Sequence, residues 1–225
     1  MNLNKMMDQG IAQMMTKRNT REIILEEALN LFSVKGYQSV TVKEIAQAVG
    51  IKDSSLYKHF DSKQAIYDTL LTWMNQKFEE TVTFYRLPQG EMESVAREYG
   101  RHDLIWLKKA CEAVFLFFLK DPQASKFRRM LTIEQYKSDD AAKTLYNWFF
   151  NDAILFQTDL FSEMIRQGSF RAGPAQIIAL QFYGPFYTLL CQYDQRPEKE
   201  AEAMALLMAH IEQFASIYQI RNEES

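Results

Sequence analysis

Apolar residues recur every three or four positions along most of the chain, which is the period of an α-helix with one buried face. The stretch from Leu145 to Met164 shows this spacing clearly. No segment alternates apolar and polar residues over the length of a strand. The pattern therefore predicts an all-α protein of about nine helices. We expect these helices to start near residues 20, 42, 53, 62, 91, 122, 140, 174 and 197.

Helix start and stop signals are closely spaced in the first third of the chain. Thr41 and Glu44 fit the capping box S/T-x-x-E, in which each side chain satisfies a backbone amide at the start of a helix. Gly36 and Gly50 offer left-handed helix ends, and Asp53 can open a further helix. The segment is therefore predicted to hold two short helices joined by a turn that contains Gly50.

Two short helices joined by a glycine-containing turn are typical of a helix-turn-helix, whose second helix enters the major groove of DNA. Here the second helix begins with small hydroxyl residues, followed by an aromatic residue and cations. Small residues let the backbone enter a groove about 12 Å wide, hydroxyls donate to bases or phosphates, and cations neutralise phosphates. The candidate DNA contacts are Lys17, Arg18, Thr41, Lys43, Ser54, Ser55, Tyr57, Lys58, His59 and Lys63.

Three of these positions have an alternative interpretation. Taken alone, Tyr57 and His59 could be surface residues packed beside the next helix, and an imidazole can cap or pack locally as easily as it meets a phosphate. Lys63 could be a solvated lysine in a first helical turn. That position is electrostatically poor for a cation, which favours a phosphate partner.

Composition excludes several other classes of protein. The 225 residues are 47% hydrophobic and 24% charged, so the chain can bury a core and is not expected to be disordered. No apolar run approaches the roughly 20 residues of a membrane span, and the N-terminus lacks an apolar signal stretch. We therefore expect a cytoplasmic protein with no membrane partner. Cys111 and Cys191 are expected to be reduced thiols without a metal site.

The net charge of −3 argues at first against a nucleic-acid partner, but the two parts of the chain differ. Up to Lys63 there are nine Lys or Arg and seven Asp or Glu, giving +2, whereas the rest has 17 and 22, giving −5. An acidic body behind a basic head would limit nonspecific affinity for DNA without preventing binding at the basic surface.

Sequence signatures of enzymes are missing. The chain has no GxSxG, HExxH, GxGxxG or P-loop motif, and its three histidines supply few general bases. His102 and Asp103 are interpreted as a helix start because no nucleophile accompanies them. We therefore expect no catalytic residues, no enzyme activity and no cofactor.

The chain beyond residue 85 is rich in aromatic side chains. Most are expected in an ordinary core, because a helical domain of this size needs many large side chains. Their number also indicates an apolar ligand, either aromatic or cationic. The candidate ligand contacts are Trp106, Phe115, Phe118, Tyr146, Phe149, Phe156, Phe182 and Phe186.

The run from Ile24 to Lys63 resembles the DNA-binding domain of tetracycline-repressor (TetR) family regulators, over about a quarter of the chain. Two departures are local: Lys52 and Asp53 stand where the family usually has a Ser cap, and Val42 replaces a hydroxyl often found after Thr41. The charge of Asp53 bears on the base preference. The matching positions are Ala28, Phe32, Gly36, Thr41, Ile45, Ala46, Gly50, Ser55, Leu56, Tyr57, His59, Phe60 and Lys63.

The resemblance implies an N-terminal three-helix helix-turn-helix domain followed by a C-terminal helical domain that binds a small effector and dimerises. The expected divisions are a flexible lead over 1–16, the DNA-binding domain over 17–63, and the effector and dimerisation domain over 64–225. We expect homodimerisation through residues 174–193 and 197–220. The helix expected over 62–85 would link the effector to DNA binding.

The implied function is ligand-responsive regulation of transcription, most often repression. A homodimer would bind a near-palindromic double-stranded operator and be released by a small apolar or aromatic effector. The alternative is a dimeric helix-turn-helix regulator controlled by a protein partner, which an exposed apolar groove without an internal cavity would favour.

Overall fold

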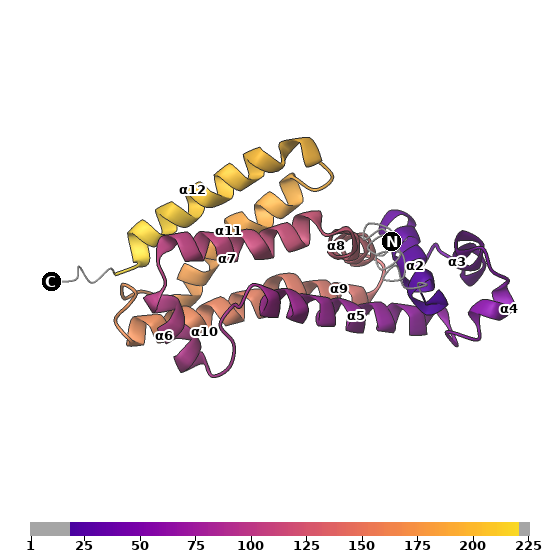
Figure 1. Cartoon of the computed structure of the whole chain (residues 1–225), viewed down its shortest axis with the longest axis horizontal. Coiled ribbons are helices and arrows are strands. Elements are labelled where there is room, and N and C mark those ends of the chain that lie inside the picture. Colours follow the sequence, from indigo (N-terminus) through magenta and orange to yellow (C-terminus); the bar gives the residue numbers. More distant parts are fainter. Residues whose placement is uncertain (1–18, 221–225) are drawn as a thin grey trace, which may run out of the picture. The chain divides into compact units, whose positions relative to one another are not determined.

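The computed structural model describes residues 19–220, and within that range the chain is helical with no strand (Figure 1). This confirms the all-α prediction. The chain divides into two compact units, Met1–Trp73 and Met74–Ser225. The division falls inside the long helix α5, Lys63–Phe84, so one continuous helix belongs to both units.

The described part of the first unit is a small helical domain around a closed apolar core. The side chain of Asn19 caps the first helix by accepting a hydrogen bond from the Arg21 amide at 3.1 Å. Gly36 ends that helix, and Gly50 ends the next in a left-handed conformation (φ 79°), as the sequence predicts. The elements are α2 (Thr20–Lys35), α3 (Val42–Val49), α4 (Asp53–Leu56) and the first part of α5 (Lys63–Phe84). Their buried apolar side chains include Ile24, Ala28, Phe32, Ile45, Leu56, Phe60, Ile66 and Leu70.

The second unit is a bundle of longer helices. Asp121 and Pro122 start one of them as predicted: the Asp121 side chain accepts from the amides of Gln123 and Ala124 at 3.0 and 2.9 Å. After α5 the helices are α6 (Met92–Arg101), α7 (Leu104–Lys120), α8 (Pro122–Glu134), α9 (Asp139–Tyr146), α10 (Asp152–Arg166), α11 (Ala175–Gln192) and α12 (Glu200–Tyr218), with a π-helical turn (Asn147–Asn151) before α10 and a 3-10 turn (Pro197–Lys199) before α12.

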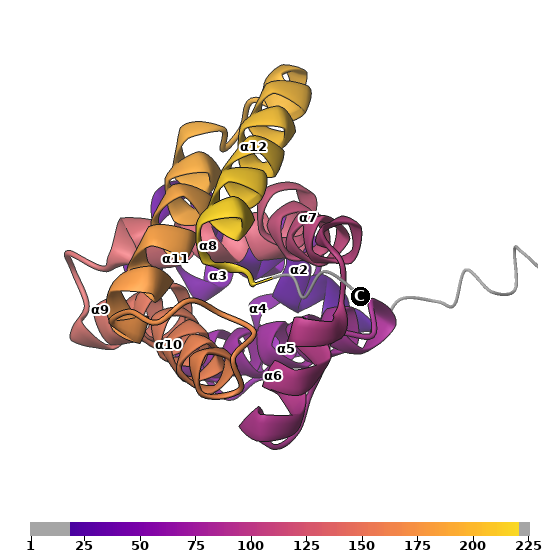
Figure 2. The same ribbon diagram turned by 90° about the vertical axis from the view of Figure 1, so that its left-hand side faces the viewer.

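Helix packing in the second unit builds the walls of a core. Helix α10 packs against α6 and α11, while α12 packs against α11 and α7. Figures 1 and 2 show α11 and α12 running side by side. The core cluster between these helices is Val95, Ala96, Leu160, Phe161, Met164, Phe170, Ile178, Ala179, Phe182 and Phe214.

Two features of this bundle refine the helix boundaries expected from the sequence. The helix start interpreted at His102 and Asp103 is present, because Asp103 caps α7 by accepting a hydrogen bond from the Trp106 amide at 2.8 Å. The stretch from near residue 140 to Gly168, expected as one helix, is interrupted by the π turn Asn147–Asn151. A π turn inserts one extra residue into the helical ladder and leaves no periodicity signal that is readable from the sequence.

Candidate functional site

Helix α3 is anchored by the capping box that the sequence predicts. The Glu44 amide donates to the Thr41 hydroxyl at 3.2 Å, and the Thr41 amide donates to the Glu44 carboxylate at 2.8 Å. Lys35 adds an ion pair to Glu44 at 2.9 Å. The hydrogen bond from Lys35, followed by those from Thr41, lowers the pKa of Glu44 from 4.5 to about 2. The Thr41 side chain is thus engaged in starting the helix that precedes the turn.

Helix α4 presents a polar surface on one side and an apolar anchor on the other. Leu56 is completely buried, which fixes the rotation of this single turn of helix. Ser54 and Lys58 are exposed, Tyr57 is 51% exposed, and Ser55 is half-buried. The small hydroxyls, the phenol and the ammonium group proposed for DNA binding are therefore presented together at α4 and the turn after it. Lys43 on α3 is also exposed.

Lys63, the first residue of α5, is engaged with the backbone of the same unit. Its ammonium group donates to the carbonyl oxygens of Tyr37 and Val40, each at 2.8 Å. The same group lies 4.3 Å from the centre of the Tyr37 ring. These contacts tie the start of α5 to the segment between α2 and α3, a role that hydrophobic periodicity cannot reveal.

The structure also shows a cation that the sequence analysis did not select. The guanidinium of Arg21 donates to the carbonyl oxygen of His59 at 2.9 Å and stacks 4.2 Å from the centre of the Phe60 ring. His59 itself is half-buried. Arg21 thereby holds the segment that follows α4 against the start of α2. Lys17 and Arg18, the two proposed arm residues, lie outside the described residues.

The second unit contains a cavity of about 580 Å³ with a mainly apolar wall. Volumes of this size accommodate small-molecule ligands. The wall is built from α5, α6, α7, α10, α11 and α12, together with the π turn and the loop that follows α5. Aromatic rings on the wall are Phe78, Tyr99, Phe118, Trp148, Phe149, Phe156, Phe161, Phe170, Phe182, Tyr183, Phe186 and Phe214.

The predicted ligand contacts fall into two groups. Five of them lie on the cavity wall: Phe118, Phe149, Phe156, Phe182 and Phe186.

The other three lie off the wall. Phe115 is fully buried and packs edge-on against Phe186 at 5.3 Å. Tyr146 is 56% exposed, and Trp106 stacks on His102 with ring centres 3.9 Å apart. Helical periodicity predicts that an aromatic side chain lies on an inward face. It does not predict whether that side chain packs against another helix or lines a cavity.

The π turn positions part of the cavity wall. Trp148 and Phe149 belong to this turn, and both line the cavity. The hydroxyl of Tyr183 on α11 donates to the carbonyl oxygen of Phe149 at 2.7 Å. Burial raises the pKa of Tyr183 above its ordinary value, so its proton is retained and the hydrogen bond is kept. This bond satisfies a carbonyl in the irregular turn and fixes the turn against α11.

The cavity wall includes two half-buried polar side chains, those of Tyr99 and Cys111. Tyr99 of α6 and Cys111 of α7 both line it and pack against the core cluster. Burial raises the pKa of the Cys111 thiol to about 12. Burial, with a smaller contribution from Cys111, also raises the pKa of Tyr99. Both groups are therefore protonated and neutral at pH 7, and the thiol is a poor nucleophile.

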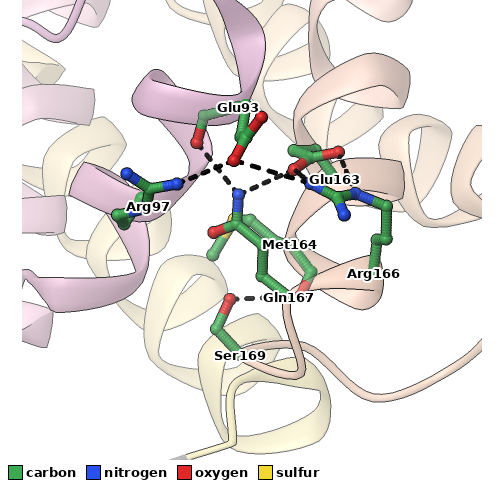
Figure 3. Close-up of polar contacts among 7 residues, drawn as sticks. All are labelled: Glu93, Arg97, Glu163, Met164, Arg166, Gln167 and Ser169. Carbon is green, nitrogen blue, oxygen red and sulfur yellow. Dashed lines mark hydrogen bonds and ion pairs between the residues drawn. The ribbon is translucent and has the colours of Figure 1, made fainter.

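An ion-pair network on the surface holds α6, one wall of the cavity, against α10 (Figure 3). Arg166 binds Glu163 through two hydrogen bonds at 2.8 and 2.5 Å, and Gln167 bridges to the Glu93 carbonyl at 2.9 Å. Arg97 pairs with Glu93 at 2.8 Å. The hydrogen bonds from Arg166 and then Gln167 lower the pKa of Glu163 from 4.5 to about 2.

The outer faces of α11 and α12 carry apolar residues in contact with solvent. Ile177 and Leu180 on α11 are 48% and 44% exposed, and Leu206 and Ile217 on α12 are 47% and 43% exposed. Small residues lie among them on α12: Ala201, Ala205 and Ala209 are exposed. This combination makes a surface on which another helix could lie close to the backbone.

Within residues 19–220, no group of three His, Cys, Asp or Glu side chains is arranged to hold a metal ion. Over the same residues, every helix is too short or too polar to cross a bilayer.

The first unit is similar in sequence to known regulators. Residues 24–70 match the family model described as "Bacterial regulatory proteins, tetR family". A stretch of 48 residues is 50% identical to the biofilm operon icaADBC HTH-type negative transcriptional regulator IcaR of Staphylococcus aureus. That stretch covers 21% of this chain and 26% of the relative, so the chain matches about a quarter of the relative's own length.

Solved structures share the fold of nearly the whole chain. A chain described as a TetR-family transcriptional regulator from Mesorhizobium loti has a TM-score of 0.63 at 18% identity, covering 89% of this chain and 97% of that one. A transcriptional regulator from Saccharomonospora viridis in complex with choline has a TM-score of 0.61 at 20% identity, covering 89% and 98%. At these identities the likeness concerns the fold.

Proposed function

Because the chain belongs to the tetR family of bacterial regulatory proteins, we propose that this transcriptional regulator is a repressor whose DNA binding is released by a small effector. Members of the family are DNA-binding transcription factors rather than enzymes. The observation that carries the proposal is the combination of a helix-turn-helix in the first unit with a cavity of about 580 Å³ in the second. The proposal thereby assigns DNA binding to the first unit and effector binding to the second.

The DNA-reading surface in this proposal is α4 with the residues around it. Ser54, Ser55 and Tyr57 would meet base edges or phosphates, and Lys43 and Lys58 would neutralise phosphates. Thr41 would contribute chiefly through α3, since its hydroxyl is used in the capping box. His59, Lys63 and the arm residues Lys17 and Arg18 complete the proposed contacts.

Two copies of the chain would pair through the outer faces of α11 and α12, within the predicted ranges 174–193 and 197–220. The exposed Ile177, Leu180 and Leu206 would be covered by the partner. A twofold dimer presents two α4 helices to DNA, and half-sites one turn apart require about 34 Å between them. This argues for a near-palindromic operator.

The effector would occupy the cavity of the second unit. The S. viridis neighbour holds choline, which supports the proposal that this fold accommodates a small molecule. Helix α5 offers a physical link to DNA binding, because Phe78 lines the cavity and packs on Phe117 and Phe118 at 5.7 and 5.5 Å. The same helix begins at Lys63 in the DNA-binding unit.

Control by a protein partner is the less favoured alternative. It would be supported by an apolar groove without an internal cavity, whereas the described residues of the second unit form a cavity of about 580 Å³ lined by twelve aromatic rings. A small molecule is the occupant that such a concave, apolar site suits best.

The proposal is tested by selecting bound duplexes from a random DNA pool. We expect enrichment of a near-palindrome whose half-site centres lie about one helical turn apart. Ser55→Ala and Tyr57→Phe should weaken binding to that duplex without loss of helical circular dichroism. Tyr136→Phe, at an exposed position on the second unit, serves as the matched control. A pool that shows no enrichment above nonspecific binding would overturn the proposal.

A further inference from the structure

The cavity wall carries few charged side chains. Among its lining residues in the described part of the chain there is no Lys or Arg. Asp152 is the only carboxylate among the described lining residues; it is exposed, and its oxygen accepts a hydrogen bond from Asn151 at 3.0 Å. His102 is the only imidazole among the lining residues that the structure describes, and its ring is stacked on Trp106. An anion placed in this cavity would find no fixed counter-charge.

Three basic groups on helices of the second unit are paired with carboxylates. The buried guanidinium of Arg128 on α8 pairs with Asp194 at 3.0 Å, and Arg129 pairs with the same carboxylate at 3.1 Å. Lys77 on α5 pairs with Asp121 at 2.8 Å. Moving any of these cations to a ligand would leave a carboxylate unpaired. Moving one of these cations to neutralise a ligand anion would therefore cost the free energy of an existing ion pair.

Of the half-buried pair Tyr99 and Cys111 on the cavity wall, Tyr99 carries the stronger hydrogen-bond donor. Its hydroxyl makes no hydrogen bond to another described residue, whereas the Tyr183 hydroxyl is already bonded to the Phe149 carbonyl. Cys111 lies close enough to influence Tyr99 electrostatically. A phenol donates a good hydrogen bond and a thiol a weak one. A ligand atom beside this pair would satisfy the phenol best by accepting.

Given the proposed function, in which this cavity holds the effector, we propose that its ligand is an uncharged aromatic molecule whose polar group accepts a hydrogen bond from Tyr99. Rings such as Phe78, Phe118 and Trp148 provide the apolar contact area. Carboxylates are rejected, because transferring an anion from water to an apolar site without a counter-charge is costly. A cation would gain cation–π contact with these rings, but it cannot accept a hydrogen bond from Tyr99, and the exposed carboxylate of Asp152 offers it only a weak solvated partner.

The test is a series of four naphthalene probes titrated calorimetrically at pH 8, where free imidazoles are uncharged. 2-Acetylnaphthalene carries a neutral acceptor, naphthalene carries none, 2-naphthoate replaces the methyl group with a negative charge, and 2-naphthyltrimethylammonium carries a positive charge. We expect the ketone to bind about five- to tenfold more tightly than naphthalene, which is the effect of one hydrogen bond. The carboxylate should bind at least about a hundredfold more weakly than the ketone.

Variants assign these preferences to residues. Tyr99→Phe should reduce the affinity for 2-acetylnaphthalene to that for naphthalene and leave naphthalene binding unchanged. Tyr136→Phe, also a loss of one phenol hydroxyl but at an 88% exposed position, should change neither affinity. Gln157→Lys would place a cation on the half-buried wall and should make 2-naphthoate bind measurably. If this last variant does not fold, the probe series and Tyr99→Phe decide alone.

Four results would overturn the inference: carboxylate binding as tight as the ketone, trimethylammonium binding tighter than the ketone, an unchanged ketone preference in Tyr99→Phe, or binding of no probe. The DNA selection is independent of all four. Enriched DNA together with any of these results would leave the repressor standing and remove the ligand class. The expected probe affinities without DNA enrichment would support the ligand class and overturn the repressor.

Discussion

At the scale of single residues, the sequence shows which side chains are cations, but it does not show which atoms those cations contact. Lys58 and Lys63 are both lysines near the proposed reading surface. Lys58 is exposed and makes no side-chain hydrogen bond to another described residue, whereas the Lys63 ammonium is held by the carbonyls of Tyr37 and Val40. Sequence spacing gives both the same DNA-binding interpretation, because no pattern of side chains reports where backbone carbonyls converge.

This difference makes a paired prediction. Lys63→Met keeps the apolar stem but leaves two carbonyls without their charged donor, so unfolding in urea should show a loss of about 1 to 3 kcal/mol. Lys58→Met should leave the free energy of unfolding unchanged within about 0.5 kcal/mol. In DNA binding, Lys58→Met should reduce the salt slope by about one.

The salt dependence of DNA binding by folded Lys63→Met protein separates a structural role of Lys63 from a phosphate contact. A slope reduced by about one would show that Lys63 also contacts a phosphate, and an unchanged slope would restrict it to the structural role. Equal stability of Lys63→Met and the parent protein would contradict the importance of the carbonyl contacts.

At the scale of elements, local chemistry predicted the helix boundaries well. The Thr41 capping box, the Gly50 ending and the Asp121–Pro122 start all lie where the residues indicate. The π turn Asn147–Asn151 was not predicted, and its Phe149 carbonyl accepts a hydrogen bond from Tyr183, which lies on a helix far along the chain. Tertiary hydrogen bonds of this kind leave no trace in local periodicity.

The capping box of α3 gives a pH-dependent prediction. The folded pKa of Glu44, about 2, lies below its ordinary value of 4.5, so its contribution to stability is present above pH 4.5 and is lost as the pH falls toward 2. Glu44→Gln should therefore lower the Tm at pH 7, and the difference from the parent protein should shrink between pH 4.5 and 2.

Subtracting the variant from the parent removes the effect of Glu163, which has a similarly lowered pKa in the second unit. A difference in Tm that stays constant from pH 7 to pH 2.5 would mean that the Glu44 charge does not stabilise α3.

At the scale of the whole molecule, the sequence predicted a helix-turn-helix followed by a helical body, and the family match and the fold agree. The wall of the cavity was harder to predict. Phe118 and Phe182 line it, whereas Phe115 and Trp106 do not, although all four recur with helical spacing. Whether an inward aromatic ring meets a hollow depends on the distances between helices, which the pattern of one helix does not contain.

In the proposed function, effector binding in the cavity and operator binding at α4 are coupled within one chain, and such coupling must be reciprocal. The affinity for the selected operator is measured with and without saturating 2-acetylnaphthalene, and the affinity for that probe is measured with and without the operator. The proposed coupling predicts that each ligand weakens the binding of the other by the same factor, about 5- to 150-fold. Independent binding of probe and operator would contradict it.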